Sequence, residues 1–163
     1  GGSCFIMEYK CQRLFRDARI FSIYEGTTQL QVVAAIRYVT NGTYLGIIKE
    51  MLENEVIADL QPLKERVAKL VVRYEEVLEA LKSNTDQEKL DFMARHLYEI
   101  TADIIMALLI LDDATRAPEL FTKSANVYVR MTEEDVLGKA AYIQNFQVED
   151  LASFRAAEES AAE

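Results

Sequence analysis

The sequence predicts an all-α protein: an up-and-down antiparallel bundle of about four to five helices, preceded by a helix pair. Half of the residues are hydrophobic, and they recur at steps of three and four, as on one face of a helix. The chain has two prolines and six glycines, too few for a loop-rich all-β protein. Short connections between long amphipathic segments imply that neighbouring helices run antiparallel.

The helix pair is predicted within residues 1–42. Apolar residues recur at helical spacing in its first helix, at Cys11, Leu14, Phe15 and Ala18. Residues 28–39 form the second helix, and Thr28 with Gln31 is a predicted capping box, in which both side chains bond to free backbone N–H groups. Gly42 is a helix-stop signal, because glycine readily takes the left-handed conformation that ends a helix.

The bundle is predicted in residues 43–163. Its first helix begins at Thr43. Pro62 suits the first turn of the next helix, where a backbone N–H would have no partner. That second helix has one apolar face for packing on a neighbour: Leu63, Val67, Leu70, Tyr74, Val77 and Leu81.

Two further helices and a short terminal one are expected. Thr85 with Glu88 is a second capping box, at the start of the third helix. The third helix also has one apolar face: Leu90, Met93, Leu97, Ile100, Ile104, Leu108 and Leu111. Pro118 begins a fourth helix that runs to about Phe146, and a short helix is expected in residues 148–160.

The charge of the chain is unevenly distributed. The formal net charge is −9, which argues against a nucleic-acid partner. Residues 1–47 hold five Lys/Arg and three Asp/Glu, whereas residues 48–163 hold 13 and 24, which indicates two regions with different roles. Two acidic clusters are expected to face solvent: Glu75, Glu76 and Glu79, and Glu133, Glu134 and Asp135. The apolar run of residues 104–111 is too short for a membrane span.

The cysteines and the histidine do not form a pattern typical of a metal site. Cys4 and Cys11 are too few for a disulfide framework or a zinc site, so we expect both to be reduced and buried, which fits the cytoplasm. His96 is the only histidine, and Met93 stands where a di-iron bundle would have glutamate. We therefore expect no metal and a partly exposed helix histidine.

Glu25 stands at the end of an apolar run, in the stretch RIFSIYEGTTQLQ of residues 19–31. Burying a charged carboxylate in such surroundings is costly. One interpretation is a carboxylate just before a helix N-terminus, where it favours the helix dipole and stabilises the fold. The other is a functional carboxylate whose surroundings serve its chemistry. From the spacing alone, the stabilising role is favoured.

Two stretches, GGSCF and EYKCQRLFRDARIFSIYEGTTQLQ, match an ordered pattern at Gly1, Gly2, Phe5, Arg16, Asp17, Ala18, Ile23, Tyr24, Glu25, Gly26, Thr27, Thr28, Gln29 and Gln31. In this the chain resembles the end of the catalytic region of acyl-CoA dehydrogenases. Cys4 stands where that family usually has glycine, and Lys10 where proline is common. The remainder resembles, more weakly, the helical extension of some bacterial members. Because the chain also opens without methionine, we expect it to be part of a longer polypeptide.

The resemblance implies FAD-dependent α,β-dehydrogenation of acyl-CoA thioesters, as in fatty acid β-oxidation. It implies that Glu25 is the base that removes the α-proton, and that Tyr24 and Gly26 lie next to the acyl-CoA substrate. The residues implied to contact FAD are Gly1, Gly2, Thr27, Thr28 and Gln29. Residues 1–42 would end the catalytic region, and residues 43–163 would be the C-terminal helical extension. The family also implies electron-transfer flavoprotein as a partner and a homo-oligomer.

The chemistry gives Glu25 a reason to be there. A carboxylate in water is too weak a base for an α-proton, but in an apolar pocket its charged form loses solvation and its pKa rises. Ile23 and Tyr24 can wall such a pocket, and Gly26 leaves room for the substrate. The helix that starts at Thr28 offers N–H groups to a polar cofactor edge. This chain alone is expected to be inactive and to retain no FAD. The alternative is a non-catalytic helical module for oligomerisation or protein interaction.

Overall fold

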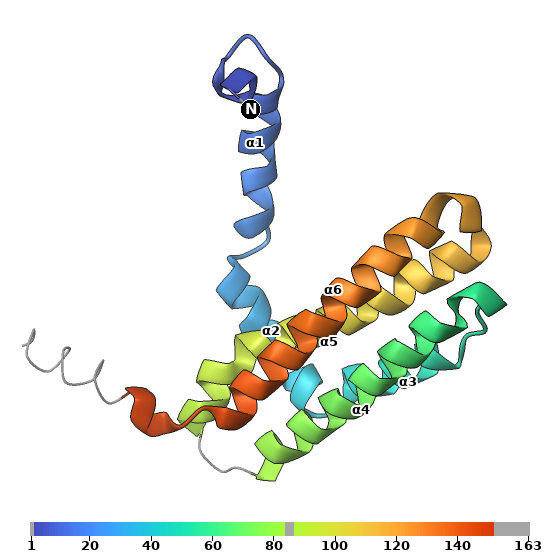
Figure 1. Cartoon of the computed structure of the whole chain (residues 1–163). Helices are drawn as coiled ribbons and strands as arrows, with labels where there is room; N and C mark the ends of the chain where they lie inside the picture. Colours follow the sequence, from blue (N-terminus) through green and yellow to red (C-terminus); the bar gives the residue numbers. More distant parts are fainter. Residues whose placement is uncertain (1, 84–86, 152–163) are drawn as a thin grey trace, which may run out of the picture. The chain divides into compact units, whose positions relative to one another are not determined.

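The computed structural model describes residues 2–83 and 87–151 (Figure 1). These residues contain six α-helices and four 3-10 helices, and no β-strand is found among them. The predicted all-α class is therefore confirmed. The chain divides into two compact units, residues 1–35 and 36–163.

The first unit contains η1 (Gly2–Phe5), α1 (Cys11–Ala18), η2 (Arg19–Ser22) and the start of α2 (Thr28–Thr40). The first predicted helix is thus present as α1, and the chain continues from it directly into the tighter turn of η2. The division between the units falls inside α2, ahead of the domain boundary predicted after residue 42. That boundary stays a prediction.

The first unit has little buried surface of its own. None of the α1 residues is buried, and α1 packs against the short segments η1 and η2. Cys11 is exposed, so the prediction that it is buried is wrong. The side chain of Cys4 lies outside the described residues. Large aromatic side chains are also exposed, with Phe5 at 91% and Phe21 at 86%.

A tight turn joins α2 to α3 (Thr43–Glu53). Gly42 has φ 88° in this turn, so the predicted helix stop is confirmed. Asn41 Oδ1 accepts hydrogen bonds from the Thr43 N–H at 2.9 Å and from the Thr43 hydroxyl at 2.7 Å. The asparagine side chain therefore satisfies one of the backbone N–H groups that are free at the start of α3.

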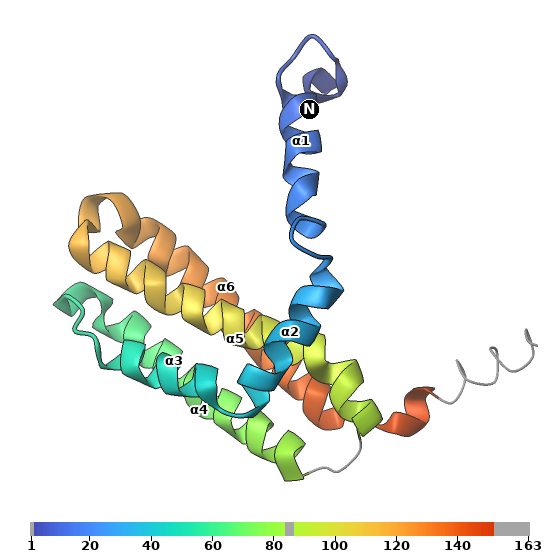
Figure 2. The ribbon, with the colours of Figure 1, turned by 180° about the vertical axis from the view of Figure 1, so that it is seen from behind.

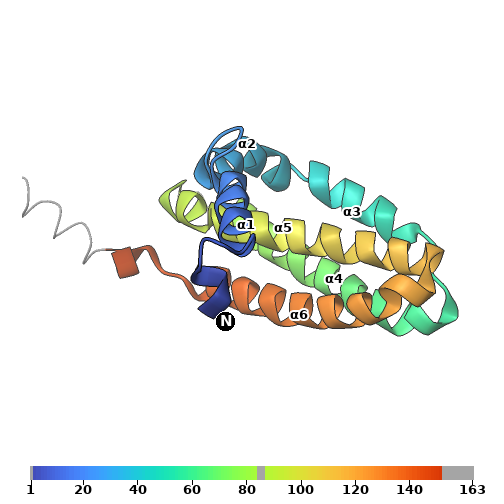
Figure 3. The same ribbon diagram turned by 90° about the horizontal axis from the view of Figure 1, so that it is seen from above.

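The second unit is an antiparallel bundle of α3, α4 (Gln61–Ser83), α5 (Gln87–Arg116) and α6 (Pro118–Asn145), seen from two sides in Figures 1 and 2. Helix α5 packs most extensively on α6, and α4 packs on both of them. Helix α3 packs on α4 and α5. In the view from above, α3 and α6 lie on opposite sides of α4 and α5 (Figure 3).

The core of the bundle follows the predicted apolar faces. All six residues of the predicted α4 face are buried, as are the predicted α5 residues apart from Leu90, which is half-buried. Helix α6 contributes mostly small and β-branched residues: Ala125, Val129, Thr132, Val136, Ala140 and Ile143. Small side chains on α6 allow close packing against a neighbouring helix.

A buried polar pair lies within this core. The Tyr74 hydroxyl and Thr101 Oγ1 are 2.8 Å apart, and Thr101 also donates to the Leu97 carbonyl at 2.8 Å. A hydroxyl has one proton and a carbonyl can only accept, so Tyr74 is the donor in the pair. Burial raises the pKa of Tyr74 to about 12, which keeps the phenol neutral. The helical spacing of Tyr74 indicated only an apolar contact and not this hydrogen bond.

The end of the chain differs in part from the prediction. Where a short helix was expected in residues 148–160, the described part is a 3-10 helix, η4 (Val148–Leu151), and the rest lies outside the described residues. The second capping box also cannot be compared, because Thr85 lies outside them. Among the helices described, none is long and apolar enough to cross a membrane.

Candidate functional site at the start of helix α2

Glu25 lies in the connection between η2 and α2, where the backbone takes an unusual conformation. The N–H groups of Ile23 and Tyr24 both donate to the Ile20 carbonyl, at 3.0 and 2.8 Å, and close the turn after η2. Glu25 then has φ 55° and Gly26 has φ 109°. Across the described ranges, Glu25 is the one residue other than glycine with positive φ. Such a conformation costs about 1–3 kcal/mol and is concentrated at functional sites.

Gly26 is required by this turn for two reasons. Its φ of 109° lies in a region that side-chain-bearing residues rarely adopt. An added Cβ would also stand 3.3 Å from the Leu30 Cβ, in the first turn of α2. The close approach of the turn to α2 therefore depends on glycine at this position.

The predicted capping box of Thr28 and Gln31 is wrong, because neither side chain makes the predicted contact. The Leu30 N–H is 3.4 Å from Thr27 Oγ1, and the Gln31 N–H donates to the Thr27 carbonyl at 3.1 Å, so Thr27 and not Thr28 is the capping residue. In a capping box the side-chain oxygen of Gln31 would accept a hydrogen bond from a backbone N–H. Instead, Gln31 Nε2 donates to the Glu25 carbonyl at 2.8 Å. The left-handed turn ends at Gly26, which makes Thr27 the residue that flanks the helix.

Most of the predicted site residues are neighbours in the sequence and lie at the turn and the α2 N-terminus. Six of them are consecutive: Tyr24, Glu25, Gly26, Thr27, Thr28 and Gln29. Gly2 lies in η1, which packs on α1, and Gly1 lies outside the described residues. The first backbone N–H groups of a helix lack intrahelical partners, so the start of α2 can receive a polar or anionic group.

The apolar surroundings that the chemistry needs are not present around Glu25. The Glu25 side chain is exposed, and the expected walls are exposed too, with Ile23 at 52% and Tyr24 at 65%. These two residues therefore do not enclose the carboxylate here. A carboxylate that is to act as a base therefore requires further apolar groups around Glu25.

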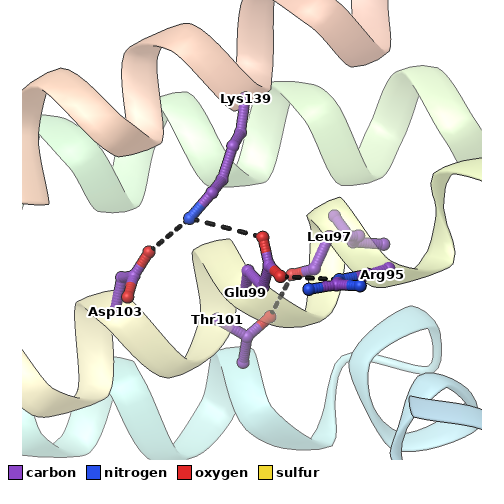
Figure 4. A network of polar contacts seen from close by, with 6 residues as sticks. All are labelled: Arg95, Leu97, Glu99, Thr101, Asp103 and Lys139. Atoms are coloured by element: carbon purple, nitrogen blue, oxygen red, sulfur yellow. Dashed lines mark hydrogen bonds and ion pairs between the residues drawn. The ribbon is translucent and has the colours of Figure 1, made fainter. Parts of the chain in front are cut away.

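A second polar cluster, within the bundle, was not predicted. Lys139 of α6 donates to Asp103 at 2.8 Å and lies 3.6 Å from Glu99, both on α5 (Figure 4). Arg95 donates to Glu99 at 2.9 Å one turn earlier on α5. The available signal was the spacing of four that aligns Arg95, Glu99 and Asp103 on one helix face. The sequence could not show that Lys139 faces them.

The charges of this cluster shift two pKa values. Burial by itself lowers the pKa of Lys139, but the hydrogen bond and charge of Asp103 and the charge of Glu99 outweigh it and raise that pKa. Burial by itself raises the pKa of Glu99, but Arg95 and the charge of Lys139 outweigh it and lower that pKa. Both groups are therefore charged over a wider pH range than in an unfolded chain.

We expect Lys139→Met to destabilise the bundle by about 1–2 kcal/mol at neutral pH, because Glu99 and Asp103 lose their shared cation in a partly buried site. Because the pKa of Glu99 is lower in the folded chain, its ionisation stabilises the fold at any pH above the pKa of Glu99 in the unfolded chain. This stabilisation is lost as the pH falls through the pKa of the folded chain. Because the pKa of Lys139 is higher in the folded chain, its protonation stabilises the fold at any pH below the pKa of Lys139 in the unfolded chain. This stabilisation is lost only at strongly alkaline pH. The difference in unfolding free energy between Lys139→Met and the unaltered chain should therefore become smaller at acid pH. Urea unfolding at several pH values measures it.

Lys123→Met is the matched control for that measurement, because Lys123 is an exposed lysine of the same helix. It should change stability by less than about 0.5 kcal/mol at any pH. Equal effects of the two substitutions, or a Lys139 effect that does not change with pH, would show that the cluster is not a coupled stabilising network.

The remaining polar candidates have structural roles. His96 is half-buried, as predicted, and its ring meets that of Tyr142 edge-on at 5.0 Å. Glu75 and Glu133 are half-buried and form ion pairs with Lys49 and Arg66, so the prediction of purely solvated acidic faces is wrong for these two. The described residues contain no group of three His, Cys, Asp or Glu side chains that could hold a metal ion.

Two curated relatives match a short stretch of the chain. The CarC subunit of the caffeyl-CoA reductase-Etf complex of Acetobacterium woodii is 58% identical over 31 residues, and a 3-(aryl)acrylate reductase of Clostridium sporogenes is 52% identical over 31 residues. Each match covers 19% of this chain and 8% of the relative. The matched part is therefore less than a tenth of the length of these relatives.

A longer match covers the bundle. A crystal structure of an acyl-CoA dehydrogenase family protein from Porphyromonas gingivalis is similar with a TM-score of 0.66 and 36% identity, over 70% of this chain and 98% of the solved one. Residues 40–151 match the family described as acyl-CoA dehydrogenase C terminal. Because this match spans more than half of its length, the chain belongs to the acyl-CoA dehydrogenase family.

Proposed function

We propose that this chain is the C-terminal part of an FAD-dependent enzyme that transfers hydrogen between the α and β carbons of an acyl-CoA thioester and a flavin. Residues 1–42 would complete the catalytic region and residues 43–163 would form the helical extension. The observation that carries the proposal is the left-handed turn of Glu25 and Gly26 directly before α2. It presents a carboxylate at a strained position, next to a helix N-terminus that can receive a polar group.

Glu25 is the proposed base. In dehydrogenation the Glu25 carboxylate would take the α-proton of the acyl-CoA, and FAD, when bound, would supply the acceptor for the β-hydride, which leaves a C=C bond between the two carbons. In the reverse direction the protonated Glu25 returns the proton to the α-carbon. Tyr24 and Gly26 flank the substrate, and glycine at position 26 leaves space for the thioester. The carboxylate works as a base only when the rest of the enzyme encloses it.

The start of α2 has polar groups of the kind that could bind a flavin. Thr27, Thr28 and Gln29 are exposed and polar, and the first N–H groups of the helix point away from its body. FAD, when bound, would supply the acceptor for the hydride. Thr27, Thr28 and Gln29 would hold a polar edge of it, and Gly1 and Gly2 would contact it from the preceding loop.

The names of the two relatives support a direction of the reaction and a protein partner for the proposed enzyme. Both are reductases, and one belongs to a complex with Etf, so we include reduction of an α,β-unsaturated acyl-CoA as a physiological direction. Electron-transfer flavoprotein is the proposed partner. A homo-oligomer, a cytoplasmic location and a role in fatty acid metabolism remain part of the proposal. The alternative of a non-catalytic module rests on the well-formed core of the bundle.

The test is to purify the full-length protein in which these residues occur. We expect bound FAD and turnover in at least one direction: oxidation of saturated acyl-CoA with a dye acceptor, or reduction of enoyl-CoA and aryl-acrylyl-CoA with a reduced dye. The ratio of the two rates identifies the physiological direction. A folded protein without flavin and without turnover in either direction would favour the non-catalytic module.

A further inference from the structure

Gln31 makes a contact that the family resemblance does not explain. It lies in the first turn of α2, and its Nε2 donates to the Glu25 carbonyl at 2.8 Å. Glu25 is six residues earlier and is the first residue of the left-handed turn. Within the part of the chain that the structure describes, this is the hydrogen bond that Glu25 makes.

The contact is directed at the base and not at the helix. The Leu30 N–H in the first turn already has Thr27 Oγ1 nearby at 3.4 Å. Gln31 donates to a carbonyl outside the helix, so it satisfies none of the free N–H groups that a capping side chain would satisfy. It also bonds to the backbone of Glu25, which leaves both carboxylate oxygens available for a proton.

The conformation of Glu25 needs support of this kind. For a residue other than glycine, a φ of 55° is sterically unfavourable. The conformation is kept only where surrounding contacts hold the backbone in place. The carbonyl of Glu25 belongs to the peptide that joins it to Gly26. Fixing that carbonyl fixes the orientation of the peptide plane, and with it the direction in which the Cα–Cβ bond of Glu25 points.

We infer that Gln31 is a positioning residue for Glu25, which holds the base in its left-handed conformation through the Glu25 carbonyl. This inference rests on the proposed function of Glu25. A base must lie within a fraction of an ångström of its productive position, so a loosened backbone lowers the rate of the chemical step more than substrate binding.

The test uses Gln31→Met in the full-length protein, because methionine keeps the length of the side chain and cannot donate. We expect kcat to fall about tenfold, the equivalent of one lost neutral hydrogen bond, while KM stays within about threefold. Gln61→Met is the matched control, since Gln61 is an exposed glutamine at the start of α4, outside the proposed site. It should leave kcat unchanged.

A double variant separates positioning from general stabilisation. If Gln31 acts through Glu25, then adding Gln31→Met to Glu25→Gln should lower kcat no further, because the base is already absent. A further tenfold loss in the double variant would overturn the inference, as would a kcat within twofold of the unaltered enzyme in Gln31→Met. If Glu25→Gln itself keeps its activity, the proposed function fails as well.

A measurement on the 163-residue chain gives a readout that does not depend on activity. A residue at φ 55° gives a strong nuclear Overhauser effect between its own amide and Hα protons. We expect this signal for Glu25 in the unaltered chain and a weaker one in Gln31→Met. An unchanged signal would show that Gln31 does not hold the conformation, whatever the catalytic result.

Discussion

Glu25→Gln should lower turnover of the full-length enzyme by several orders of magnitude and leave its flavin content nearly unchanged. Glutamine keeps the shape of the side chain but cannot take the α-proton. Loss of a general base usually costs about 10²–10⁴-fold, and we expect a larger loss because no other carboxylate lies in the stretch around the turn to replace it. Steady-state turnover and the flavin absorbance of the purified variant measure the two effects separately.

Glu8→Gln is the control for this experiment, because Glu8 is an exposed glutamate of the same unit and lies outside the proposed site. Its activity should match that of the unaltered enzyme. The assignment of Glu25 as the base is wrong if Glu25→Gln retains activity within tenfold. Loss of flavin together with activity would instead assign Glu25 a role in holding the site together.

The bundle could be predicted from the sequence because its determinants are local. Residues three or four apart share a helix face whatever the tertiary structure, so the apolar face of α4, from Leu63 to Leu81, identified its buried side directly. Pro62 and Pro118 stand in the first turns of α4 and α6, where the missing N–H costs nothing. Gly42 marked the end of α2 through its own conformational freedom.

The ion pairs could not be predicted, because they depend on which helices become neighbours. Lys139 is distant in sequence from Glu99 and Asp103, and its role follows from the packing of α6 on α5. The pair of Glu133 and Arg66 depends likewise on α4 meeting α6. The exposure of Cys11 has the same origin: a helical pattern indicates which face is apolar but not whether a partner covers it.

The functional roles of Glu25, Gly26 and Thr27 stay predictions, and the local geometry of these residues could not be predicted from the sequence. Nothing in the sequence pattern indicates that Glu25 is left-handed. The capping register was wrong by one residue for the same reason. Thr27 and Thr28 are equivalent as sequence, and the turn at Gly26 decides which of them flanks the helix.

The second large effect is expected in the bundle core. Leu97 of α5 is 0% exposed and belongs to the continuous buried cluster of the bundle. Leu97→Ala removes buried methyl groups and leaves a cavity that the surrounding helices can fill only in part, so it should cost about 2–5 kcal/mol of unfolding free energy. Urea unfolding of the 163-residue chain, followed by far-ultraviolet circular dichroism, measures this as a lower midpoint at an unchanged slope.

Leu109→Ala provides the matched comparison on the same helix, because Leu109 is 44% exposed and loses the same atoms. It should cost less than about 1 kcal/mol, since little apolar surface leaves a packed environment. Equal losses of unfolding free energy in the two variants would contradict the packing of α5, because Leu97 would then not be on the face that packs on the core. A large loss at Leu97 alone locates the stability of the bundle in its buried core, on the face of α5 that carries Leu97.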